Sequence, residues 1–139
     1  MTYTARRYTM QLYSLTVYIN CIKFQIKWEK HMNILKQLPL TETTYLILLA
    51  LRNPGHGYAV MQRVEDMSEG SVRIAAGTMY GALDNLSKQE LIQSVKSEDP
   101  RRKVFETTKE GLALLQQETI RMEKQIALYQ SIMKENGDL

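Results

Sequence analysis

The sequence has few of the residues on which enzymes and disulfide-stabilised proteins depend. Its single cysteine, Cys21, excludes an intramolecular disulfide and a zinc site made of several cysteines. There is no glycine-rich phosphate loop, no H-E-x-x-H motif and no serine or cysteine nucleophile motif. His56 has no neighbouring ligand residues for a haem or metal. We therefore predict no enzyme activity, no cofactor and no metal, and expect Cys21 to be a half-buried apolar residue.

Long hydrophobic runs are also absent. The uncharged stretch from Met10 to Ile22 is too short to span a bilayer, and Gln11, Ser14 and Asn20 interrupt it. No small-residue cleavage site of the signal-peptide type follows this stretch. These observations predict a protein without a membrane partner, and the single cysteine is compatible with a reducing cytosol.

Basic residues are not in excess where a nucleic-acid-binding domain would need them. The net charge is +3, but residues 1–31 contain five basic residues and one acidic residue. Residues 32–139 contain 13 basic and 14 acidic residues. Any basic surface for DNA must therefore be local.

Residues 1–31 are rich in tyrosine and β-branched residues and are interpreted as an N-terminal extension of doubtful status. Met32 opens a segment with the pattern of a complete domain, so the extension is attributed to a start codon assigned too far upstream. The alternative is an amphipathic segment that packs on the domain or on a membrane surface.

Residues 32–107 predict three short helices. Thr41 is a plausible N-cap for the first helix, whose apolar run at 45–51 belongs in the core. The second helix begins near Gly57, and a short strand is expected at Val72–Ile74. The expected buried face of the second helix consists of Val60, Met61, Val64 and Met67.

The third predicted helix runs from about Thr78 to Gln89. Its inner face carries Met79, Leu83 and Leu86. Small and hydrogen-bonding residues on the opposite face suit a helix that enters the major groove of DNA. An ordinary amphipathic surface helix fits the same pattern equally well. The outer residues are Thr78, Gly81, Asp84, Asn85 and Lys88, with Tyr80 on the flank.

A β-hairpin follows, with strands at 91–96 and 101–107 and a turn at 97–100. Arg101, Arg102 and Lys103 form a basic run at its tip and return strand. Such a run is often only a solvated charge cluster. Here the order helix, helix, strand, helix, strand, strand is that of a winged helix, whose wing contacts the phosphate backbone.

Residues 108–139 predict one long helix capped by Thr108. Its apolar residues recur at alternating spacings of three and four, with one polar member. A helix of this length exceeds what a domain of roughly 70 residues can cover, so we expect intramolecular packing first and a homodimer seam beyond it. The seam consists of Leu112, Leu115, Thr119, Met122, Ile126, Tyr129 and Met133.

Four stretches resemble the PadR family of bacterial transcriptional regulators. They are L-P-L-T-E-T-T-Y-L-I-L-L-A-L (38–51), H-G-Y-A-V-M (56–61), G-T-M-Y-G-A-L (77–83) and R-R-K-V-F-E-T-T-K-E-G (101–111). The resemblance implies a cytosolic homodimer that binds operator DNA, usually as a repressor, and releases it on a chemical signal. The chain is similar to the short subfamily with a single C-terminal dimerisation helix.

The resemblance also implies roles for individual residues. Thr78 and Tyr80 match positions expected at the DNA backbone and groove, and Arg101 and Arg102 match the wing. Tyr58 opens the second helix, where its hydroxyl and nearby amides can meet a phosphate.

The expected fold is therefore mainly α-helical with a small β-hairpin: a winged helix-turn-helix over 32–107 and a dimerisation helix over 108–139. The preferred function is binding of a palindromic double-stranded operator. One alternative is a sensor whose dimer interface binds a flat hydrophobic or aromatic effector, and another is a winged helix used for protein contact. The expected DNA-binding residues are Tyr58, Thr78, Tyr80, Asn85, Lys88, Arg101, Arg102 and Lys103. The expected dimerisation or effector residues are Leu115, Met122, Ile126, Tyr129 and Met133.

Overall fold

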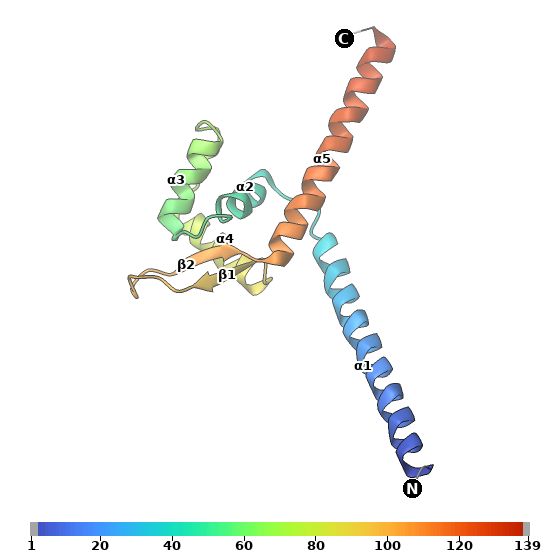
Figure 1. Cartoon of the computed structure of the whole chain (residues 1–139). Coiled ribbons are helices and arrows are strands. Elements are labelled where there is room, and N and C mark those ends of the chain that lie inside the picture. The colour runs from blue at the N-terminus through green and yellow to red at the C-terminus, as the bar shows by residue number, and fades with distance from the viewer. Residues whose placement is uncertain (1–2, 138–139) are drawn as a thin grey trace. The chain divides into compact units, whose positions relative to one another are not determined.

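A computed structural model describes the backbone of residues 3–137 and the side chains of residues 15–137 except His31 and Ile34 (Figure 1). The chain divides into two compact units, Met1–Lys36 and Gln37–Leu139. The long C-terminal helix belongs to the same unit as the domain before it.

The first unit is one helix, α1, which spans Tyr3–Leu35. It continues through Met32, and the chain leaves helical geometry just before Pro39, which disfavours helix in the residue preceding it. Among its described side chains, large apolar ones such as Ile19, Ile22 and Trp28 are exposed and are spread around the helix. That distribution is not the one-sided pattern of an amphipathic helix.

Cys21 lies on this helix and is exposed, so the expectation of a half-buried cysteine was wrong. The expectation assumed a packed neighbour for this stretch, and the neighbouring side chains of the helix are exposed as well. No helix in the described part of the chain is long and apolar enough to cross a membrane.

In its described residues, the second unit contains four helices and an antiparallel hairpin. The elements are α2 (Glu42–Ala50), α3 (Gly57–Met67), α4 (Ala76–Lys88), β1 (Ile92–Val95), β2 (Val104–Thr107) and α5 (Lys109–Asn136). Helices α2, α3 and α4 pack with the hairpin, and α5 leaves the hairpin as a long helix (Figure 1). The mainly α-helical fold with a small hairpin and a long last helix is therefore confirmed.

Two predicted N-caps begin their helices as expected. The Thr41 hydroxyl accepts a hydrogen bond from the Thr44 amide at 3.2 Å, and the Thr108 hydroxyl accepts one from the Gly111 amide at 3.1 Å. Each satisfies an amide that the first turn of a helix leaves unpaired. Local residue spacing was enough to predict both helix starts.

The core lies between α2, α3, α4, the hairpin and the start of α5. Met67, expected in the buried face of α3, is 43 % exposed because the helix ends at this residue and the chain turns at Ser68. Val60 and Val64 are fully buried as expected, and Met61 is half-buried. The fully buried apolar side chains are Ile47, Leu48, Leu51, Val60, Val64, Met79, Leu83, Leu91, Ile92 and Leu114.

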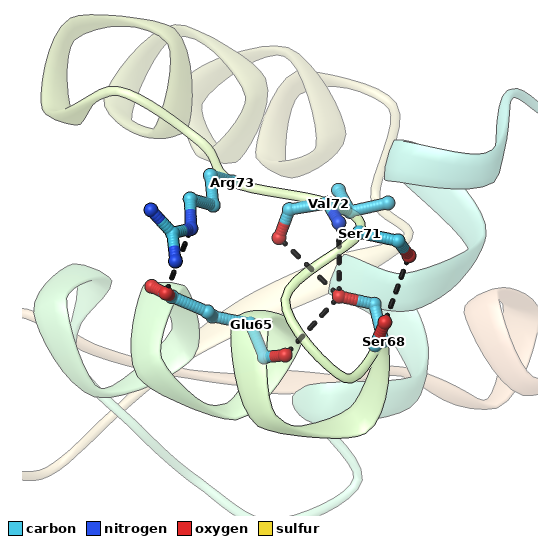
Figure 2. Close-up of polar contacts among 5 residues, drawn as sticks. All are labelled: Glu65, Ser68, Ser71, Val72 and Arg73. Carbon is cyan, nitrogen blue, oxygen red and sulfur yellow. Dashed lines mark hydrogen bonds and ion pairs between the residues drawn. The ribbon is translucent and has the colours of Figure 1, made fainter.

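No strand forms at Val72–Ile74, so that prediction was wrong. The Ser68 hydroxyl accepts from the Val72 amide at 3.0 Å, and the Ser71 hydroxyl donates to the Ser68 carbonyl at 2.8 Å (Figure 2). Arg73 pairs with Glu65 at 2.9 Å across the same turn. These bonds satisfy the backbone locally, and the turn between α3 and α4 needs no strand partner.

Gly55, and not residues 72–74, pairs with the outer edge of the hairpin. The Gly55 and Phe105 amides each donate to the other residue's carbonyl at 3.0 Å. Within the hairpin, β1 pairs with β2 from Ile92↔Thr107 to Val95↔Val104. The loop between the strands therefore covers residues 96–103.

The basic run lies in this loop and not in the returning strand, which was expected to begin at Arg101. Asp99 explains the difference. Its carboxylate accepts from the Arg101 amide at 2.9 Å, and its carbonyl accepts from the Arg102 amide at 3.1 Å. Arg101 and Arg102 are therefore held in a turn and cannot pair with β1.

Helix α5 changes its surroundings along its length. Leu114 and Leu115 are buried against the domain, and the Thr119 hydroxyl lies 3.0 Å from the hydroxyl of Tyr45 on α2. Thr119 is the polar member of the predicted seam, and Tyr45 accounts for its polarity. Beyond it, Ile126 and Tyr129 are more than half exposed.

Candidate nucleic-acid interface

A groove of about 590 Å³ lies where the start of α3, one flank of α4 and the loop between β1 and β2 meet. Its lining includes Tyr58, Tyr80 and the three basic residues of the loop. The fold thus brings together five of the eight residues expected to bind DNA. They come from three segments that are far apart in the sequence.

The backbone pairing of Gly55 with Phe105 sets the position of the basic loop relative to the start of α3. Gly55 lies one residue before the N-cap of α3, and Phe105 lies two residues after the basic run. The Thr107 hydroxyl also donates to the Leu48 carbonyl at 2.7 Å, which ties β2 to α2. The stem of the wing and the start of α3 therefore form one hydrogen-bonded frame.

Arg63 on α3 stabilises this frame by binding the loop between α2 and α3. Its guanidinium donates to the carbonyls of Asn53 at 2.6 Å, Ala50 at 3.2 Å and Pro54 at 3.2 Å. A Cβ at Gly55 would lie 2.8 Å from the guanidinium, so any other residue there would require the guanidinium to shift. Arg63 therefore also satisfies carbonyls that the end of α2 leaves unpaired.

The two tyrosines of the groove are exposed, Tyr58 by 62 % and Tyr80 by 57 %. Tyr80 lies against Gly57, where an added Cβ would come within 2.9 Å of the ring and 3.4 Å of the hydroxyl. The Tyr80 hydroxyl is therefore held at the first turn of α3. At this end of a helix, free amides favour an anion.

The basic loop presents its charges to solvent. Arg101, Arg102 and Lys103 are all exposed, and the Arg102 side chain is 3.7 Å from the carboxylate of Asp99. An exposed pair at that distance contributes little to stability. The three cations therefore remain available to an anionic partner.

The remaining expected residues lie on α4 but outside the groove. Thr78 and Asn85 are exposed on its solvent side, and the Asn85 side chain accepts from Gln89 at 3.2 Å. Lys88 pairs with Asp84 at 2.6 Å. Gly77 and Gly81 complete this face, and a Cβ at either would touch nothing within 4 Å.

Three polar groove residues, His56, Asp84 and Ser87, were not among the expected site residues. In the sequence alone, Asp84 is one more polar residue on the outer face of a helix, and His56 is an isolated histidine. Only the folded chain places both beside the basic loop. Among the described residues, no group of three His, Cys, Asp or Glu side chains could hold a metal ion.

Residues 46–117, just over half of the chain, match the sequence pattern of the Transcriptional regulator PadR-like family. The chain belongs to this family. Members of the PadR family regulate transcription, so this PadR-family protein is a transcriptional regulator and not an enzyme. A comparison with curated protein sequences found no match.

Several solved structures share the fold, and two of them are named as PadR-family or PadR-like regulators. The regulator from Eggerthella lenta DSM 2243 has a TM-score of 0.54 at 22 % identity, with 85 % of this chain and 96 % of that chain covered. The PadR-like regulator from Bacillus cereus has a TM-score of 0.55 at 18 % identity, with 66 % and 90 % covered. RosR of H. salinarum has a TM-score of 0.52 at 20 % identity, with 74 % and 99 % covered. At these identities the likeness supports the winged-helix fold alone.

Proposed function

We propose that this PadR-family protein is a homodimeric, cytoplasmic repressor that binds a palindromic double-stranded operator. The observation that carries the proposal is the groove in which exposed Tyr58, Tyr80 and the loop Arg101–Lys103 converge. These side chains provide hydroxyl donors and permanent positive charge within one groove. A phosphate backbone is the partner that matches both.

Base reading is assigned to the solvent side of α4. Exposed glycine in a helix costs roughly 0.5–1 kcal/mol relative to alanine, and neither packing nor backbone angle requires Gly77 or Gly81. Their smallness lets another surface approach the helix closely. Thr78, Asn85 and Lys88 then supply hydrogen-bonding groups to base edges in the major groove.

Dimerisation is assigned to the second half of α5. Ile126 and Tyr129 are exposed on the side that continues the buried stripe of Leu115. On the same side, Met122 lies one turn before Ile126, and Met133 lies one turn after Tyr129. A second copy of the helix would cover this stripe and place two α4 helices symmetrically. Two symmetric reading helices match two half-sites of a palindrome.

A second candidate function rests on the same exposed stripe. The aromatic ring of Tyr129 among aliphatic side chains suits a planar hydrophobic effector at the dimer interface. Binding of such a compound would change the spacing of the two α4 helices and release DNA. A planar dye that binds the protein and also lowers operator affinity would support this function.

The test of the main function is footprinting of the full-length protein on the DNA upstream of its own gene. We expect a protected palindrome whose half-sites lie about one helical turn apart. Replacing Arg101 and Arg102 with alanine should weaken binding to every duplex and reduce the salt slope by roughly 0.9 for each phosphate that is no longer neutralised. The matched control is Lys124→Ala with Lys134→Ala, which removes the same charge from exposed positions on α5.

An unchanged salt slope in the Arg101 and Arg102 variant would contradict the role of the wing. If the wild-type protein bound no duplex even at low salt, a winged helix used for protein contact would replace the proposal.

A further inference from the structure

His56 is the residue that immediately precedes α3, and it also lines the groove. Its backbone is extended, with φ −83° and ψ 162°, as expected for an N-cap residue. The Ala59 amide donates to Nδ1 of its ring at 3.3 Å. The histidine therefore takes the place of the serine, threonine or aspartate that usually caps a helix.

This bond determines which ring nitrogen carries the proton. A backbone amide can only donate, so Nδ1 must accept with its lone pair. In a neutral imidazole with Nδ1 as the acceptor, the proton is on Nε2. The cap thus fixes the tautomer of the neutral ring and its orientation.

His56 lies in surroundings that suit an anion. His56 shares the groove with Tyr58, Tyr80 and the loop Arg101–Lys103. The one carboxylate among the groove residues, Asp84, is paired with Lys88 at 2.6 Å. Within the described part of the chain, the ring makes its hydrogen bond to Ala59 and no other.

We propose that His56 is a DNA-contacting residue that acts in its neutral form: Nδ1 caps α3 while Nε2–H donates to a backbone phosphate. The inference rests on the proposed function, because it assumes that the groove receives DNA. It adds an uncharged, oriented contact to the charged contacts of the wing. Such a contact fixes the position of the phosphate without releasing a counterion.

Two substitutions separate the two roles of the ring. His56→Asn places a capping group near the position of Nδ1 but does not reach the position of Nε2. His56→Gln extends an amide toward the position of Nε2 but gives up the N-cap. Both variants are made in the full-length chain, so the basic α1 helix is the same in each. The probe is a duplex of random sequence, since a phosphate contact needs no particular bases.

For His56→Asn we expect unchanged thermal stability and a Kd about tenfold higher, as for loss of one hydrogen bond to a charged group. The slope of log Kd against log salt should equal that of the wild type, because a neutral donor releases no counterion. His56→Gln should melt at a lower temperature and bind the duplex more tightly than His56→Asn does. The matched control is Thr41→Asn, a cap exchange on α2 outside the groove, which should leave Kd unchanged.

Several outcomes would overturn the proposal. Wild-type affinity in His56→Asn means that Nε2–H contacts no phosphate. A smaller salt slope in His56→Asn means that the wild-type ring binds as a cation. Equal weakening in both variants means that the ring acts through its bulk and not through Nε2.

The ¹⁵N chemical shifts of the His56 ring give a second measurement that does not depend on stability. They should show the Nε2–H form in both the free protein and the complex, and a protonated ring in the complex contradicts the proposal. Failure of the proposed function is distinguishable from these outcomes, because the wild type itself would then not bind the duplex.

Discussion

The two halves of α5 carry the same apolar spacing but lie in different surroundings. From Lys109 to Thr119 the helix packs on its own domain, and Leu114 is fully buried. From Ile120 to Asn136 most side chains are exposed, including Ile126 and Tyr129. A heptad pattern therefore predicts that a face will be covered, but it does not tell which chain covers it.

An ion pair whose carboxylate is buried marks the boundary between the halves, and the sequence did not suggest it. Glu118 is only 2 % exposed, and the Arg121 guanidinium donates to its carboxylate at 2.9 Å. This hydrogen bond and the amide of Leu40 lower the pKa of the Glu118 carboxyl, against the opposing effect of burial. Glu118 thereby ties α5 to the turn before α2.

The largest effect is expected where α5 is buried in its own domain. Leu114→Ala should lower the free energy of unfolding by about 2–5 kcal/mol, because it leaves a cavity in the core. Urea denaturation measures this loss. The matched control on the exposed half is Leu128→Ala, which should change stability by less than about 0.5 kcal/mol. Equal losses in the two variants would remove the distinction between the halves.

The next effect concerns the exposed half and should appear only in association. Ile126→Glu places like charges opposite each other across the proposed two-fold seam, so the dimer Kd should rise by at least about tenfold. Sedimentation at several protein concentrations measures it. Lys124→Glu introduces the same residue on the opposite side of the helix and should leave the dimer intact. A dimer that tolerates Ile126→Glu would place the interface elsewhere.

The smallest effect concerns the boundary itself. Because the pKa of Glu118 is lower in the folded chain, its stabilising contribution is present above the ordinary carboxyl pKa and is lost as the pH falls through the folded value. Glu118→Gln should therefore reduce the loss of stability on acidification. Thermal melts from neutral to acidic pH measure this, with Glu123→Gln as the exposed control on the same helix. If wild type and Glu118→Gln lost the same stability on acidification, the pair of Glu118 and Arg121 would not be the source of that loss.

Features set by neighbours in the sequence were predictable. Thr41 and Thr108 cap their helices as predicted, and Met79, Leu83 and Leu86 form the inner face of α4. Spacing along a helix determines these features before any tertiary contact forms.

Features that depend on competing or distant contacts were not predictable. The alternation at Val72–Ile74 suggested a strand, but the Ser68 hydroxyl satisfies that backbone locally. The burial of Glu118 depends on Arg121 and on Leu40, and the groove joins His56 to Arg101 across the fold. An acid or a histidine in an otherwise polar stretch carries no signal of such partners.

The pairing of Gly55 with Phe105 has a consequence for how members of this fold can differ in length. The amide of each residue donates a hydrogen bond to the carbonyl of the other. A residue inserted between Lys103 and Phe105 would therefore shift the register of the stem and displace the start of α3. Insertions in the loop 96–103 meet no such constraint, because its two ends are already held by β1 and β2. The tip of the wing can therefore lengthen or shorten while its stem keeps a fixed length.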